Sequence, residues 1–349
     1  MIFPLTDIVI TGFSAVTPAG IGVEPVLELI RSGRDALTPV PAETAGRSGA
    51  RWGRTLGFKA TDFIPPLKAR KLDRCSQFAV AAAGLALKDA GVDRNTLQPE
   101  RIGIALGCGF GGVANSAEFL AGYFAAGVEG LSPILFPNTV SNAAASNVSI
   151  EYGLKGPNVT QVQRFCSAES AFMMACRFIS EGRADIMLTG GVDDLMPLML
   201  SGFAAAGQLR RYAREFGEGC GLLVLESAGH ASGRGAVVKG LADSIRTVGL
   251  LLPGHEPEGV DLLMDVSGSA TPSLVSLSGT ASVLPAFRER VSGIPSLDTG
   301  RVIGSSLAMG GTAMAVLLAS LHPGQTGLHL AASPEGPFYS IRFSGGPPV

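Results

Sequence analysis

The chain has 349 residues, enough to bury a large core, and 46% of them are hydrophobic. Its 27 basic and 29 acidic side chains nearly cancel, which argues against a surface for nucleic acid. No apolar run reaches the roughly 18 residues that a membrane span needs, so none is predicted. The amino terminus lacks the basic start of a signal peptide, which predicts a cytoplasmic protein.

Short β-rich runs alternate with longer helical patterns, as is typical of an α/β protein with buried sheets. The predicted strands, in chain order, span residues 7–12, 102–107, 158–163, 184–190, 220–226, 236–240, 260–267, 326–331 and 338–344. The predicted helices span residues 23–31, 76–89, 114–126, 140–152, 167–181, 271–289 and 307–321.

The spacing of the cysteines and of the glycines limits which metals or cofactors this chain is expected to bind. The five cysteines are widely spaced and form no Cys-x-x-Cys pair, so we expect reduced thiols and no metal site. The glycine run 107–112 matches neither dinucleotide-binding nor P-loop spacing. No cofactor is therefore predicted.

The most informative segment runs from Gly156-Pro157 through an apolar strand to Phe165-Cys166-Ser167, and a helical pattern follows. The helix leads to Gly182-x-Ala-Asp and then to the Gly190-Gly191 strand. This arrangement resembles the nucleophile elbow of the β-ketoacyl-acyl carrier protein (ACP) synthases. Counted from either side, the cysteine position of that family falls on Phe165, and Cys166 comes one residue late.

Other motifs extend the resemblance over nearly the whole chain. Residues 70–73, Arg-Lys-Leu-Asp, and residues 216–221, Phe-Gly-Glu-Gly-Cys-Gly, are similar to elements of the same family. The resemblance implies a thiolase-like α/β fold, a five-layer αβαβα sandwich of two related halves. These would span residues 1–240 and 241–349, with the second half shortened between residues 240 and 261 and at its end.

The family dimerises through the strand before the nucleophile. The resemblance places this strand at roughly residues 157–163. The dimer-strand candidates are Pro157, Val159, Gln161 and Gln163.

The catalytic residues of the family are replaced in this chain. The family's first histidine, in a His-Gly-Thr-x-Thr-Pro motif, corresponds to Ser267. Its second, in Lys-x-x-x-Gly-His, corresponds to Ser305, and the lysine to Gly300. With Phe165 at the cysteine position, the thiolate, both imidazoles and the ammonium group are absent, so no catalytic residue is predicted.

A ketosynthase-like chain without catalytic residues most resembles the chain-length factor, or KSβ subunit, of type II polyketide synthases. The resemblance implies a heterodimer with a catalytic ketosynthase (KSα), and an ACP that delivers a phosphopantetheine-linked acyl chain. The chain-length gate would comprise Phe110, Val113, Ala117 and Phe136. Chain-length factors usually carry glutamine at the lost cysteine position, whereas Phe165 would plug its own acyl pocket.

Other readings of the sequence remain open. The protein is alternatively a homodimeric scaffold, a pseudoenzyme that binds acyl chains or carrier protein, or an acyltransferase or hydrolase that uses Cys166. Arg164 and Glu169, which flank the elbow, are expected to pair with each other or with a partner chain. His329 is expected in a loop or at the end of an element, too far away to act as a base.

Overall fold

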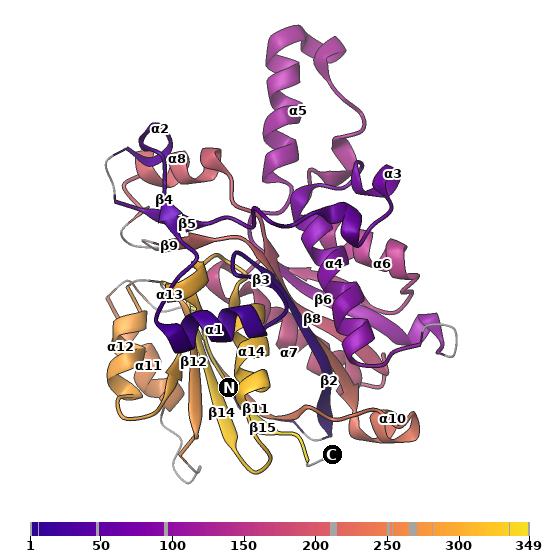
Figure 1. Cartoon of the computed structure of the whole chain (residues 1–349), viewed down its shortest axis with the longest axis vertical. Coiled ribbons are helices and arrows are strands. Elements are labelled where there is room, and N and C mark those ends of the chain that lie inside the picture. The colour runs from indigo at the N-terminus through magenta and orange to yellow at the C-terminus, as the bar shows by residue number, and fades with distance from the viewer. Residues whose placement is uncertain are drawn as a thin grey trace.

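The computed structural model describes residues 2–5, 7–46, 49–93, 97–209, 215–249, 252, 254–264, 271–280, 282–334 and 336–347. One large mixed sheet forms the body of the molecule, and the helices lie on its faces (Figure 1). Helix α5 (Val113–Ala126) projects from this body as an arm. No helix within the described residues is long and apolar enough to cross a membrane.

The main sheet has two parts that meet where β2 (Ile8–Thr17) pairs with β11 (Gly240–Val248). On the amino-terminal side the strand order continues through β10 (Gly219–Ser227), β8 (Ile186–Asp193), β6 (Ile102–Cys108) and β7 (Asn158–Gln161). On the carboxy-terminal side it continues through β15 (Phe338–Gly345), β14 (Thr326–Ala332), β12 (Leu274–Gly279) and β13 (Ser296–Leu297). Strand β7 is therefore an outer edge.

Short elements complete the strands. Strand β1 (Ile2–Pro4) pairs with β11, and β3 (Gly20–Ile21) pairs with β2. A second, small sheet comprises β4 (Thr38–Pro39), β5 (Arg51–Gly53) and β9 (Glu215–Gly217).

Two helices lie between the two parts of the main sheet. Helix α7 (Ser167–Ser180) packs on β6 and β8, while α14 (Gly310–Ser320) contacts strands of both parts, including β10 and β12. Helices α4 (Arg74–Asp89) and α6 (Ala143–Tyr152) lie on one side, and α11 (Glu256–Met264) and α12 (Leu284–Arg290) on the other. The succession of helix, sheet, helix, sheet and helix is the predicted five-layer αβαβα sandwich.

The remaining helices are short. They are α1 (Glu24–Ser32), α2 (Ala42–Ala45), α3 (Pro66–Ala69), α8 (Pro197–Ala205), α10 (Ala228–Gly233) and α13 (Thr299–Ile303). Single 3-10 turns are η1 (Ala60–Asp62), η2 (Pro99–Arg101), η3 (Gly127–Gly130), η4 (Phe136–Asn138) and η5 (Arg164–Cys166).

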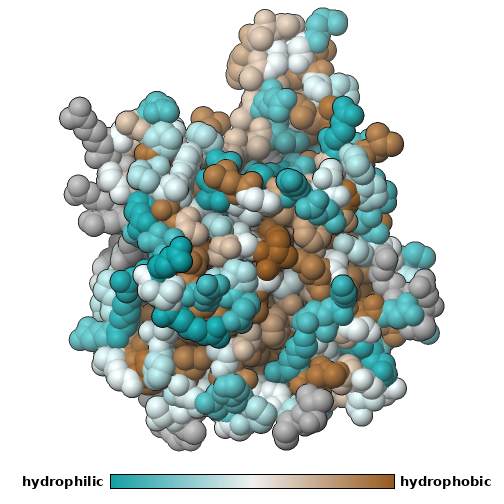
Figure 2. Space-filling model, in the orientation of Figure 1, coloured by the Kyte–Doolittle hydropathy of each residue, from teal (hydrophilic) through white to brown (hydrophobic). Residues whose placement is uncertain are grey.

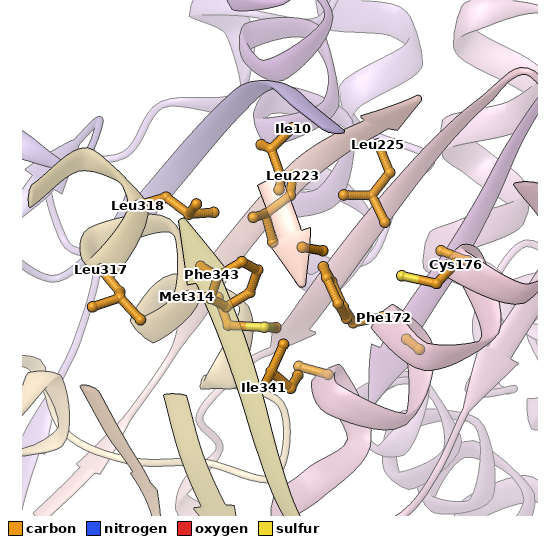
Figure 3. Packing of buried hydrophobic residues seen from close by; sticks show 14 of the residues in the cluster. Ile10, Phe172, Cys176, Leu223, Leu225, Met314, Leu317, Leu318, Ile341 and Phe343 are labelled. Atoms are coloured by element: carbon orange, nitrogen blue, oxygen red, sulfur yellow. The ribbon is translucent and has the colours of Figure 1, made fainter. Parts of the chain in front are cut away.

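The central core lies where α7 and α14 meet the sheet. In Figure 3, Phe172 of α7, Met314 of α14 and Phe343 of β15 point toward one another. The rings of Phe172 and Phe343 form an edge-to-face pair with centroids 5.6 Å apart, a favoured aromatic geometry. Burial of each such side chain contributes roughly 1.5–3 kcal/mol, so this packing fixes α7, and with it the elbow.

Helix α14 also depends on glycine. A Cβ atom at Gly311 would lie 2.3 Å from the carbonyl oxygen of Gly221, and one at Gly221 would lie 2.2 Å from the amide nitrogen of Thr312. Only glycine at both positions lets α14 lie this close to β10.

Most predicted elements match, but the region after residue 240 differs. The predicted strand at 260–267 is instead part of helix α11, as far as residue 264, and residues 265–267 lie outside the described residues. The predicted helix at 271–289 contains β12 and then α12. The predicted strand at 236–240 begins only at Gly240 and continues to Val248. Apolar periodicity misled here because short, fully buried strands and helices have similar patterns.

Candidate functional site: a closed nucleophile elbow

The segment between β7 and α7 forms a tight strand-to-helix elbow. Arg164 adopts a left-handed backbone with φ of 52°, which costs a non-glycine residue about 1 kcal/mol or more. The Ser167 hydroxyl accepts a hydrogen bond from the Gln163 amide at 2.9 Å and donates one to the Arg164 carbonyl at 2.7 Å. The Ser167 hydroxyl therefore stabilises the strained turn at Arg164. Phe165, the residue after Arg164, is buried.

Phe165 carries no chemistry and is closed off from solvent. Its exposed fraction is 3%, at the start of the turn that leads into α7. The structure therefore presents a phenyl ring at the position that the sequence motif assigns to the nucleophile.

Cys166, the neighbouring thiol, is fully buried and donates a hydrogen bond to the carbonyl of Pro337 at 3.2 Å. Burial raises the pKa of this thiol well above its usual value, and the negative charge of Glu169 raises it further. Since the thiolate is the reactive species, this environment opposes a nucleophilic role for Cys166.

Ser305 and Gly300, which are expected at the positions of the family's second histidine and lysine, lie close to the elbow. Ser305 follows α13, and its backbone joins β9 through a 3.1 Å bond from its amide to the carbonyl of Glu215. A Cβ atom at Gly300 would lie 2.4 Å from the Ser305 hydroxyl, so these two positions are adjacent. The same segment reaches the elbow through Leu307, whose carbonyl accepts a 3.3 Å bond from the Ser167 amide.

Ser267 lies outside the described residues. Strands β12 and β14 both pack against the elbow turn, and β12 ends in Ser278-Gly279, with Thr280 directly after it. This Ser-Gly-Thr run matches the Gly-Thr of the family's histidine motif, so Ser278 is a second candidate for the lost histidine. The sequence prediction missed it because residues 271–289 read as one helix.

A buried polar chain lies beneath the elbow. The Glu169 carboxyl is 2.8 Å from Nε2 of His329, and Nδ1 of His329 is 2.7 Å from the Ser276 hydroxyl. All three residues are fully buried. Two expectations were wrong: Glu169 pairs with His329 instead of Arg164, and His329 lies in the middle of β14. The order serine, histidine, acid resembles a hydrolytic triad, but burial closes this hydroxyl to a substrate.

The Glu169 carboxyl lies where two helices begin. It is in the first turn of α7, and a Cβ atom at Gly310, the first residue of α14, would lie 1.8 Å from its Oε1 atom. The positive ends of both helix dipoles favour a carboxylate at this point. Glu169 is therefore an anchor between the central helices.

A second buried acid fixes the turn before α5. Asp193 accepts hydrogen bonds from the backbone amides of Gly109 at 2.9 Å and Phe110 at 2.8 Å. Burial raises the pKa of Asp193 to about 6 and that of the adjacent Asp194 to about 7. The sequence analysis missed both residues, although they directly follow the Gly190-Gly191 strand.

The predicted gate residues gather around the base and arm of α5. Phe110 forms an edge-to-face pair with Phe203 of α8, with ring centroids 5.9 Å apart, and Val113 and Ala117 are half-buried. Phe136 packs against Phe119 at 5.8 Å but is 64% exposed.

The predicted dimer strand is present at the sheet edge. Val159 and Gln161 lie within β7, which pairs with β6 alone among the described residues; Pro157 and Gln163 flank it. The Gln163 side chain accepts a hydrogen bond from the Tyr339 hydroxyl at 3.3 Å. The outer backbone edge of β7 is therefore available for pairing.

The described part of the chain contains no group of three or more histidine, cysteine or carboxylate side chains placed to hold a metal ion. The five cysteines are free and buried, as expected from their spacing.

The fold and the elbow define a protein with ketosynthase architecture, and comparison with known proteins agrees. Residues 5–231 match the family described as β-ketoacyl synthase, N-terminal domain. The 3-oxoacyl-[acyl-carrier-protein] synthase 2 of Synechocystis sp. is 31% identical over 251 residues, which cover 67% of this chain and 60% of that protein. Its counterpart in Vibrio cholerae is 30% identical over 249 residues, with 66% and 60% covered. The chain belongs to the β-ketoacyl synthase family, and it matches about 60% of the length of these relatives.

Solved structures show the same thiolase-like fold. The ishigamide ketosynthase/chain length factor aligns over 97% of this chain and 99% of its own, with a TM-score of 0.83 and 23% identity. A β-ketoacyl synthase from Burkholderia phymatum covers 98% of this chain and 100% of its own, with a TM-score of 0.80 and 20% identity. A type II polyketide synthase ketosynthase solved in complex with its acyl-carrier protein covers 97% of this chain and 99% of its own, with a TM-score of 0.78 and 20% identity.

Proposed function

We propose that this chain is a non-catalytic chain-length factor (KSβ) and that it pairs with a catalytic ketosynthase in type II polyketide or polyene biosynthesis. The observation that carries this proposal is the buried ring of Phe165 at the cysteine position of an otherwise retained elbow. In such a pair, the partner's cysteine carries the growing chain, and this subunit shapes the tunnel at the interface.

The missing functions cannot be supplied from nearby. Condensation needs a thiolate nucleophile and imidazoles that stabilise an enolate. Cys166 has a raised pKa and no access to solvent, and His329 is held between Glu169 and Ser276. The degenerate positions Phe165, Ser305 and Gly300, with Ser267 or Ser278, therefore leave the chain without condensing activity of its own.

Exposed apolar side chains on the α5 arm and on nearby elements support a dimeric role. Leu120, Tyr123 and Phe124 on the α5 arm are exposed, Phe124 by 80%. Val128 and Ile150, on neighbouring elements, are 74% and 78% exposed. Figure 2 shows hydrophobic atoms on this arm. Obligate interfaces bury more than about 2,000 Å² and are rich in apolar side chains, so an arm of this kind together with an open strand edge suits a permanent partner of the same fold.

Phe110, Val113, Ala117 and Phe136 would form the gate. Phe110 and Val113 follow the carboxyl end of β6, which pairs in parallel with β7, so a partner that docks at β7 would come close to this turn. Bulk at the end of an interface tunnel limits the acyl chain sterically. The acyl chain would be delivered by an ACP through its phosphopantetheine arm, in the cytoplasm.

The test is co-expression of this chain with catalytic ketosynthases of its host, followed by native mass spectrometry. We expect a one-to-one heterodimer that condenses acyl and malonyl groups on the partner's cysteine, and no activity from this chain alone. A stable homodimer that ignores every catalytic ketosynthase would contradict the chain-length role and favour the scaffold.

A homodimeric scaffold is the second candidate, because the same β7 edge and α5 arm are suited to a second copy of this chain. An acyltransferase that uses Cys166 is disfavoured by the burial and the raised pKa of that thiol.

A further inference from the structure

A cavity of about 540 Å³ is lined by residues of α1 and α13. Both helices lie away from the α5 arm (Figure 1). The walls of the cavity come from both parts of the chain: residues 30–51 and Glu215 on one side, and residues 288–302 on the other. Hydrophilic side chains gather over α1 on this face (Figure 2). Four arginines line it, Arg34, Arg51, Arg288 and Arg301, against three acids.

Two of these arginines are already neutralised. Arg51 contacts Asp35 at 2.6 Å, and Arg288 pairs with Asp298. The Arg51 hydrogen bond lowers the pKa of Asp35, so that this carboxyl is ionised at neutral pH. The Arg51–Asp35 pair lies on the wall formed by residues 30–51, and the Arg288–Asp298 pair lies on the wall formed by residues 288–302.

Arg34 and Arg301 have no ion pair with any acid in the described part of the chain. Both are exposed at the mouth of the cavity. Even with Glu215 counted, the lining carries one more positive than negative charge. Two guanidinium groups are thus free to bind an anion.

The walls are also held in place without a ligand. The Ala36 amide donates to the Val302 carbonyl at 2.8 Å, and the Ser305 amide donates to the Glu215 carbonyl at 3.1 Å. A site that is formed before binding loses less entropy when the ligand arrives.

We propose that this cavity binds a small molecule that carries a phosphate group, with Arg34 and Arg301 as its charge partners. The planar forks of arginine match phosphate oxygens in pairs. The volume lies within the range of roughly 300–1,000 Å³ that is typical of small-molecule sites. The acids on the rim disfavour an acidic protein surface, whereas a compact anion can sit between the arginines.

The experiment titrates inorganic pyrophosphate into the full chain, monitored by calorimetry and by fluorescence. The single tryptophan, Trp52, adjoins Arg51 and serves as the reporter. The double variant Arg34→Gln/Arg301→Gln should bind at least about tenfold more weakly, since each lost charge-assisted bond costs affinity. The matched control, Arg177→Gln/Arg183→Gln, removes the same charge from α7 and the turn after it and should bind as wild type does.

Thermal unfolding establishes that both double variants are folded, which is expected because the four side chains are exposed. Absence of binding by wild type at about 10 mM pyrophosphate would overturn the proposal. Equal weakening in the control variant would show that pyrophosphate is attracted only by the general positive charge of the protein, and would also overturn the proposal. Succinate that binds as tightly as pyrophosphate would replace phosphate by carboxylate and also contradict it.

Discussion

The elbow and the α5 arm follow the carboxyl ends of the neighbouring parallel strands β7 and β6, but they differ in burial and polarity. At the elbow, Phe165, Cys166 and Glu169 are buried, and the polar groups of Cys166 and Glu169 make hydrogen bonds within the protein. On the arm, Tyr123 and Phe124 are apolar and open to solvent. A site that reacts with a substrate needs accessible polar groups, whereas a surface that docks needs accessible apolar groups. This contrast supports the proposal that the chain acts through its surface and that the elbow has a structural role.

The largest effect is expected from breaking the buried chain beneath the elbow. Glu169→Ala leaves His329 without its charged partner in the core, and breaking a buried pair costs about 3–5 kcal/mol. Urea denaturation should show this loss in the free energy of unfolding. Glu181→Ala, in the cap of the same helix, removes an exposed pair with Arg177 and should cost well under 1 kcal/mol. Equal losses in the two variants would refute the anchoring role.

A charged residue on the α5 arm should weaken assembly with a partner. Phe124→Asp places a carboxylate in the proposed interface and should weaken assembly with the partner by about 100-fold, or about 3 kcal/mol. Leu262→Asp, on α11 at a distant exposed site, is the control and should assemble normally. Sedimentation velocity measures both. Unchanged assembly of the Phe124 variant would show that the interface does not include the α5 arm.

The buried acids predict an unusual pH dependence. The pKa of Asp194 is about 7 in the folded chain, against about 4 when exposed, so the folded state holds its proton longer. This residue's contribution to stability is complete below pH 4 and is lost as the pH rises toward 7. Asp194→Asn should therefore gain about 4 kcal/mol over wild type between pH 4 and pH 8, because each pKa unit corresponds to about 1.4 kcal/mol.

Asp185, whose pKa is lowered instead of raised, provides a control. Arg101 lowers the pKa of Asp185 through their hydrogen bond, so Asp185→Asn should show no such gain between pH 5 and pH 8. Parallel stability curves for wild type and the Asp194 variant would show that Asp194 ionises normally.

The smallest change in stability, but the most specific in outcome, is expected at the gate. Phe110→Ala removes a half-buried ring that packs on Phe203, at a cost of about 1–3 kcal/mol. The assembled complex should release longer products at a rate still set by the partner's cysteine. Unchanged product lengths from a folded complex would direct attention to Val113, Ala117 and Phe136.

Much of this architecture follows from the sequence, because motif order and hydrophobic periodicity report local structure well. The elbow, α7 and β8 lie where the spacing of Phe165 and Gly190 predicts. The pairing of Glu169 with His329 joins residues 160 positions apart. No local sequence pattern indicates such a contact. The cavity lined by Arg34 and Arg301 likewise joins segments that are far apart in the sequence. Around β12, the apolar run is short and mostly buried, so its period does not distinguish strand from helix.

The central claim is that the elbow has lost its nucleophile, and acylation tests it most directly. The purified chain would be incubated with an acyl-ACP or an acyl thioester and examined by intact-protein mass spectrometry. We expect no acyl adduct on the wild-type chain and none on Cys166→Ala. A stoichiometric adduct on the wild type that disappears in Cys166→Ala would contradict the account and make Cys166 the nucleophile.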